Sequence, residues 1–286
     1  MSTLTSVVSA HENGFKAWVK RHPLISMYAF LFALAWAVMV PQALYSQGII
    51  SAPLPLWLEI LTGWAPGIAA VSVAAIASGR AGVRDLLGRF RIWRVGVQWY
   101  LVSLFALAAL ILGGIGLHVL FGGAMPSIPS AGIPLWQIAL IFTVTVFVGV
   151  LVNTEEIAWR GFALPRLQAR YNVLVAAVLL AIPELALHLP LFFVKENPFY
   201  PTVGLAAFSA FSVAMVFIYA FVFNKTRGSL LIVTLMHASQ NAWANLLSDN
   251  SARPFHFTVA LAWMIAIALI LITKGQLGYE PEQTAR

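Results

Sequence analysis

The sequence has no cysteine and few charged residues. Without cysteine there can be no disulfides, no thiol chemistry and no zinc site built on thiolates. Charged residues make up only 9% of the 286 residues, whereas a soluble domain usually carries about 25%. Hydrophobic residues make up 60%, and the mean hydropathy is +0.86. This balance excludes a soluble enzyme, a disordered chain and a nucleic-acid-binding domain, and leaves a membrane protein.

Apolar runs recur along the whole chain, each long enough to cross a bilayer as a helix of about 20 residues. Backbone inside lipid must satisfy its own hydrogen bonds, and the alternating pattern of a membrane β-barrel is missing, so these runs predict helices. We therefore expect an all-α, polytopic integral membrane protein with eight transmembrane helices. The predicted spans are residues 24–45, 57–77, 99–121, 134–163, 173–194, 203–223, 230–247 and 255–273.

The basic residues predict the orientation of these helices. With the N-terminus in the cytoplasm, all 17 Lys and Arg side chains except Lys195 and Arg253 fall on the cytoplasmic side. Both termini are then cytoplasmic, and we expect a multi-pass protein of a bacterial inner membrane. The predicted parts are an N-terminal segment at 1–23, a transmembrane domain at 24–273 with its core at about 134–247, and a C-terminal tail at 274–286.

Ionisable and amide side chains gather in three of the predicted spans. A charge at the centre of a bilayer costs about 3 kcal/mol on insertion scales, so such residues usually face each other or a wet cavity. We expect them to lie at one depth and to open toward the cytoplasm. The residues are Glu155, Glu156 and Arg160 in the fourth span, Glu184 and His188 in the fifth, and His237 and Asn241 in the seventh.

The two neighbouring glutamates have different expected roles. Glu156 and Arg160 are four residues apart with the acid first, the favourable order for an ion pair within a helix, and such a pair is typically structural. Glu155 points about 100° away around the helix and stays free to act as a general base.

The histidines and the amide leave alternatives open. His237 and Asn241 share one helical face, and with His188 they have the chemistry to orient a water molecule or stabilise an oxyanion. Each of them alone is also typical of hydrogen bonds between membrane helices. Glu184, one turn before His188, either orients that ring or joins the site.

At these residues the chain resembles the CPBP family of intramembrane endopeptidases, also called the Abi family. That family includes type II CAAX prenyl proteases and bacteriocin-processing relatives, and its signature is EExxxR, then FxxxH, then HxxxN. This chain has Glu155-Glu156-x-x-x-Arg160, then His188, then His237-x-x-x-Asn241. The family's Phe is replaced by Glu184, which is the one departure. The likeness extends upstream to PGIAAV at 66–71.

The resemblance implies an endopeptidase that hydrolyses a peptide bond of a membrane-associated protein or peptide, with the lipid bilayer as its other partner. It implies that Glu155 and His188 activate water while His237 and Asn241 form the oxyanion site. The implied supporting residues are Glu156 and Arg160, and Glu184, which departs from the family pattern, is a further supporting candidate. A divalent metal such as zinc is the candidate cofactor, although there is no HExxH motif, and its candidate ligands are Glu155, His188 and His237.

Two other classes of function fit a membrane protein of this kind. One is a non-catalytic scaffold or immunity protein with the same fold, and the other is a proton-coupled transporter that uses the acids and histidines as a relay. The complete Glu/His/His/Asn set argues against the scaffold. The absence of an internal repeat in the sequence argues against the transporter.

Overall fold

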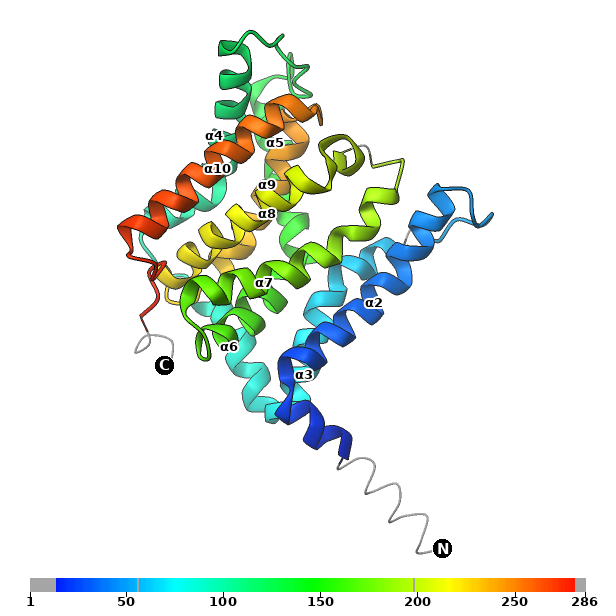
Figure 1. Cartoon of the computed structure of the whole chain (residues 1–286), viewed down its shortest axis with the longest axis vertical. Coiled ribbons are helices and arrows are strands. Elements are labelled where there is room, and N and C mark those ends of the chain that lie inside the picture. The colour runs from blue at the N-terminus through cyan, green and yellow to red at the C-terminus, as the bar shows by residue number, and fades with distance from the viewer. Residues whose placement is uncertain (1–13, 56, 198, 281–286) are drawn as a thin grey trace, which may run out of the picture.

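A computed structural model describes residues 14–55, 57–197 and 199–280 (Figure 1). All the regular elements in these residues are helices, and these residues contain no strand. The elements are α2 (Pro23–Ser46), α3 (Trp57–Gly88), η1 (Arg89–Arg91), α4 (Val97–Leu120), α5 (Leu135–Val152), η2 (Ile157–Ala163), α6 (Leu164–Gln168), α7 (Val173–His188), η3 (Leu189–Phe193), α8 (Phe199–Lys225), α9 (Leu230–Leu247) and α10 (Ala252–Ile272).

Within the described residues, seven helices are long and apolar enough to cross a membrane: α2, α3, α4, α5, α7, α8 and α10. The expected all-α, polytopic fold is therefore confirmed. The remaining predicted span, 230–247, forms α9 as expected but is not among the seven. It carries His237, Gln240, Asn241 and Asn245, whose polarity lowers its hydropathy.

The packing places α9 among other helices (Figure 1). It packs against α4 and α5, while α4 also packs against α10, and α8 packs against α7 and α10. On the other side of the molecule α2 packs against α3. Neighbouring helices thus surround the most polar helix, which removes most of the cost of its polar side chains in lipid.

The two ends of the helical bundle differ in their content of basic residues. We call the end that carries Arg94 and Arg227 the basic end. There the guanidinium of Arg227 donates to the backbone oxygen of Arg94 (2.6 Å), and Ser229 donates to the backbone oxygen of Ile92 (2.6 Å). At the opposite end, the backbone N–H of Ser130 donates to the backbone oxygen of Leu246 (3.1 Å). The loops that join α4 to α5 and α9 to α10 therefore meet at the opposite end.

The fourth predicted span is not one continuous helix. α5 ends at Val152, Asn153 adopts an extended conformation (φ −97°, ψ 108°), and the chain re-enters a helix that contains the π-helical turn η2. Single π-helical turns occur frequently at functional sites. The break falls directly before the glutamate pair.

Two glycines of α3 hold this break in place. Thr154 donates from its backbone N–H (2.9 Å) and its hydroxyl (2.8 Å) to the backbone oxygen of Gly63, and its hydroxyl accepts from the backbone N–H of Gly67 (2.9 Å). A Cβ atom on Gly63 would lie 2.4 Å from the backbone oxygen of Val152, and one on Gly67 would lie 2.7 Å from the Thr154 side chain. Only glycine lets the two backbones approach so closely.

Gly63→Ala is therefore expected to destabilise the protein. Its Cβ meets backbone rather than a movable side chain, and overpacking of this kind typically costs about 1–3 kcal/mol. The matched control is Gly116→Ala in α4, where nothing lies within 4 Å of the added Cβ. Thermal unfolding in detergent should show a lower midpoint for Gly63→Ala only. Equal midpoints would show that the break tolerates the methyl group.

The orientation of the bundle stays a prediction, and the lack of native cysteine makes it simple to test. Ser127 lies between α4 and α5 and Ser78 lies in α3, and both are exposed. A cysteine at Ser127 is expected to react with an impermeant maleimide on intact cells, and one at Ser78 only after lysis, because the basic end should face the cytoplasm. The reverse pattern would invert the assignment.

Candidate functional site

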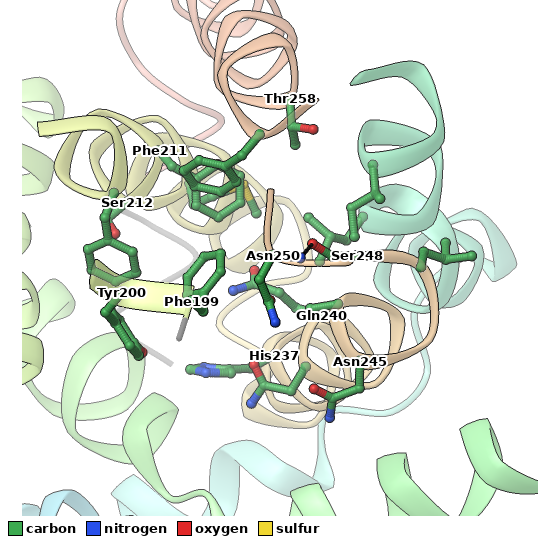
Figure 2. Close-up of a pocket in the computed structure, with 18 of the residues that line it drawn as sticks. Phe199, Tyr200, Phe211, Ser212, His237, Gln240, Asn245, Ser248, Asn250 and Thr258 are labelled. Atoms are coloured by element: carbon green, nitrogen blue, oxygen red, sulfur yellow. Dashed lines mark hydrogen bonds between the residues drawn. The ribbon is translucent and has the colours of Figure 1, made fainter. Parts of the chain in front are cut away.

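All the side chains singled out by the motifs, except Arg160, line one cavity of about 510 Å³. They come from three parts of the chain: the segment after the α5 break, the end of α7, and the middle of α9. Figure 2 shows part of this cavity, with Phe199, Tyr200 and Phe211 from α8 and His237, Gln240 and Asn245 from α9. The motif residues that line it are Glu155, Glu156, Glu184, His188, His237 and Asn241.

The Glu155 carboxylate is held by two N–H donors. Trp159 Nε1 donates to its Oε2 (3.0 Å), and Asn153 Nδ2 donates to its Oε1 (3.4 Å). Trp159 is four residues further along the chain and fully buried, so its indole anchors the carboxylate from within the protein. Donors of this kind favour the ionised form of a carboxylate.

Arg160 is shared between two carboxylates. Its Nη1 donates to Glu156 Oε1 and to Glu184 Oε1, each at 3.1 Å, and its guanidinium carbon lies 4.5 Å from the centre of the Tyr219 ring. Arg160 and Glu156 are both only 1% exposed. Glu156 Oε1 also accepts from His237 Nδ1 (2.9 Å), so this network ties the first motif to α9.

Glu184 does not interact with His188 through its side chain. His188 Nδ1 instead donates to the backbone oxygen of Glu184 (2.8 Å), while the Glu184 carboxylate points to Arg160. The His188 ring also packs against the rings of Tyr200 and Phe208. Because Nδ1 carries the proton, the neutral ring has a lone pair on Nε2. Replacing an aromatic residue with Glu184 thus adds a second carboxylate to Arg160.

Three further residues belong to this site and lie outside the motifs: Asn153, Trp159 and Tyr219. Asn153 and Trp159 contact Glu155, and Tyr219 packs under Arg160 and donates to Gln240 (3.2 Å). For Trp159 the i,i+4 spacing from Glu155 was an available signal in the sequence. Asn153 reaches the site only because the helix breaks there, which apolar periodicity does not reveal.

The cavity extends toward the end of the bundle opposite to the basic end. Its lining includes Asn197 before α8 and Ser248, Asp249 and Asn250 after α9. The sequence predicted an opening toward the cytoplasm, and this stays a prediction, as does the orientation of the bundle.

The candidate metal ligands do not form a metal centre in this arrangement. No three His, Asp or Glu side chains in the described parts of the chain lie so as to hold a metal ion. Both ring nitrogens of His237 face other side chains, with Nδ1 at 2.9 Å from Glu156 and Nε2 at 3.2 Å from Asn153. A zinc site takes four ligands around one point, and these donors do not converge in that way.

Comparison with known proteins agrees with the motifs. Residues 134–243 match the family described as type II CAAX prenyl endopeptidase Rce1-like. A CAAX prenyl protease 2 of Methanococcus maripaludis is 28% identical over 199 residues, which cover 67% of this chain and 72% of that protein. The matched region contains all three motifs and begins where the sequence predicted the core. The segment that carries the site, residues 134–243, is thus similar to the Rce1-like family of type II CAAX prenyl endopeptidases.

Proposed function

We propose that this protein is an intramembrane endopeptidase that hydrolyses a peptide bond of a membrane-associated protein or peptide, with Glu155 as the general base. One observation supports this most: the Glu155 carboxylate is fixed by Trp159 and Asn153 in the same cavity as two imidazoles and the Asn241 amide. A base must be held within reach of the proton that it removes. A scaffold protein would have no need of this arrangement.

In the proposed reaction, Glu155 removes a proton from a water molecule as the water oxygen bonds to the carbonyl carbon of the substrate. His188, with its Nε2 lone pair, accepts a hydrogen bond from the same water and orients it. The carbonyl oxygen becomes an oxyanion, and Asn241 supplies N–H donors for it. Glu155 then returns the proton to the leaving nitrogen, the C–N bond breaks, and the products are a carboxylic acid and an amine.

The cavity suits a peptide segment with at least one apolar side chain. Its α8 wall is aromatic, with Phe199, Tyr200, Phe208 and Phe211, and its α9 wall is polar. An extended peptide has backbone N–H and C=O groups for the polar wall and apolar side chains for the aromatic one. A prenylated substrate is indicated by the name of the Methanococcus maripaludis relative and by the description of the matched family, and by no residue of the cavity wall.

The proposal is tested by comparing the membrane proteomes of cells that produce the wild-type protein and the Glu155→Gln variant. Uncleaved membrane proteins should accumulate in the variant, and their new termini should appear when wild-type protein is restored. The purified enzyme should then cleave a peptide that spans the mapped site. If the two proteomes are identical at equal protein levels, the proposed function is wrong.

A further inference from the structure

Asn153 lies between the proposed base and an imidazole from another helix. Its Nδ2 is 3.4 Å from Glu155 Oε1 and 3.2 Å from His237 Nε2. It is the first residue after α5, which ends at Val152, and its backbone is extended. The next residue, Thr154, is held by its hydroxyl hydrogen bond to the backbone oxygen of Gly63, which fixes the position of Asn153.

The orientation of the Asn153 amide follows from its contacts. The backbone N–H of Glu155 donates to the amide oxygen Oδ1 (3.0 Å), and an N–H group can only meet an acceptor. The nitrogen Nδ2 must then face Glu155 Oε1 and His237 Nε2. Exchanging the two amide atoms would place the oxygen against a carboxylate and the nitrogen against an N–H donor.

The same reasoning fixes the proton on His237. Nδ1 faces Glu156 Oε1 at 2.9 Å, and an ionised carboxylate only accepts, so the proton is on Nδ1. Nε2 faces the Asn153 N–H at 3.2 Å, so it accepts and carries no proton. A carboxylate on one side and an amide donor on the other thus specify one neutral form of the ring.

We propose that Asn153 is a positioning residue that holds His237 as the neutral Nδ1–H tautomer and links this ring to Glu155. The proposal rests on the function proposed above. It also changes one expected role, since an imidazole whose Nε2 accepts from Asn153 has no N–H to offer an oxyanion. That donor role then belongs to Asn241, and His237 acts as a fixed support for Asn153 and Glu156.

The protonation state of His237 tests this directly, without any substrate. In full-length protein labelled with ¹⁵N-histidine, the His237 signal is identified by its loss in His237→Gln. We expect a protonated Nδ1 and an unprotonated Nε2 in the wild type. Asn153→Asp replaces the donor with an acceptor, so both nitrogens should become protonated. Asn153→Ala leaves Glu156 to hold the proton on Nδ1 and removes the donor to Nε2, so the Nε2 signal alone should shift.

The matched control is Asn172→Asp. Asn172 caps α7 at an exposed position, where its Oδ1 accepts from the backbone N–H of Val175 (2.9 Å), and aspartate caps a helix equally well. This variant should leave the His237 spectrum and the activity unchanged. Any change in its spectrum would show that the Asn153→Asp result is not specific to that position.

Kinetics with a mapped substrate peptide give the second measurement. Loss of one hydrogen bond in the site should lower kcat about tenfold in Asn153→Ala, with little change in KM. A His237 spectrum that stays as in the wild type in both Asn153 variants would overturn the proposal, as would unchanged kcat. If Glu155→Gln stayed active while the spectra changed as expected, the proposed function would fail and the tautomer assignment would stand.

Discussion

Glu155→Gln is expected to abolish peptide hydrolysis and to leave the protein folded. Glutamine has the shape of glutamate and keeps an oxygen that can accept from Trp159 Nε1, so the local packing persists. It cannot take a proton from water at neutral pH. Removing a general base typically lowers the rate by about 10²–10⁴-fold. The measurement is the rate of peptide cleavage by purified protein, with thermal unfolding as the check on folding.

Two other glutamates give the comparison for this experiment. Glu196→Gln changes an exposed carboxylate outside the cavity lining and should cleave at the wild-type rate. Glu156→Gln keeps an oxygen that can accept from Arg160 and His237, and Arg160 still has Glu184. We therefore expect Glu156→Gln to stay folded and to lose less activity than Glu155→Gln. Wild-type cleavage by Glu155→Gln would remove Glu155 as the base.

Arg160→Gln is expected to prevent stable folding. Arg160 is 1% exposed, and it is the cation that Glu156 and Glu184 share, each at 3.1 Å. Removing one partner of a buried ion pair typically costs about 3–5 kcal/mol, because it leaves a buried charge without compensation. In this variant two carboxylates, Glu156 and Glu184, would be left without their cation. The folded yield in detergent and the thermal midpoint should both fall.

The cause can be separated from a simple loss of packing. The triple variant Arg160→Gln, Glu156→Gln, Glu184→Gln contains no charge in this network and should recover much of the folded yield. Arg166→Gln is the matched arginine control. Burial, together with the nearby Arg89, lowers the pKa of Arg166 to about 10, so removing this charge also removes a repulsion. If the triple variant folds no better than Arg160→Gln, the ion pairs are not what stabilises this region.

Glu184, where the chain departs from the family pattern, makes a different contact from the one that the sequence indicated. The sequence indicated an interaction with His188, since the two are four residues apart on one helix. In the structure the backbone carbonyl of Glu184 accepts a hydrogen bond from His188 Nδ1, while the Glu184 carboxylate contacts Arg160. Spacing along a helix predicts which residues share a face, but it does not predict which atom of each makes the contact.

The sequence by itself determined the class of protein and the helical fold, and it predicted the residues of the candidate site. Composition alone excludes a soluble protein, because an apolar surface of this extent cannot be kept from water. Apolar runs long enough to span a bilayer predict helices, because unpaired backbone is too costly in lipid. The glutamates, histidines and Asn241 were identified because polar groups in such helices must meet one another.

Tertiary structure alone decided where the chain breaks, which residues line the cavity, and where Asn153 lies. The break before Glu155 depends on Gly63 and Gly67 of α3, about 90 residues earlier in the chain, and on hydrogen bonds that no periodicity encodes. The lining of the cavity depends on which helices pack against one another. Asn153 reaches His237 only after both are in place, because a hydrogen bond between residues 84 positions apart is a property of the packed chain.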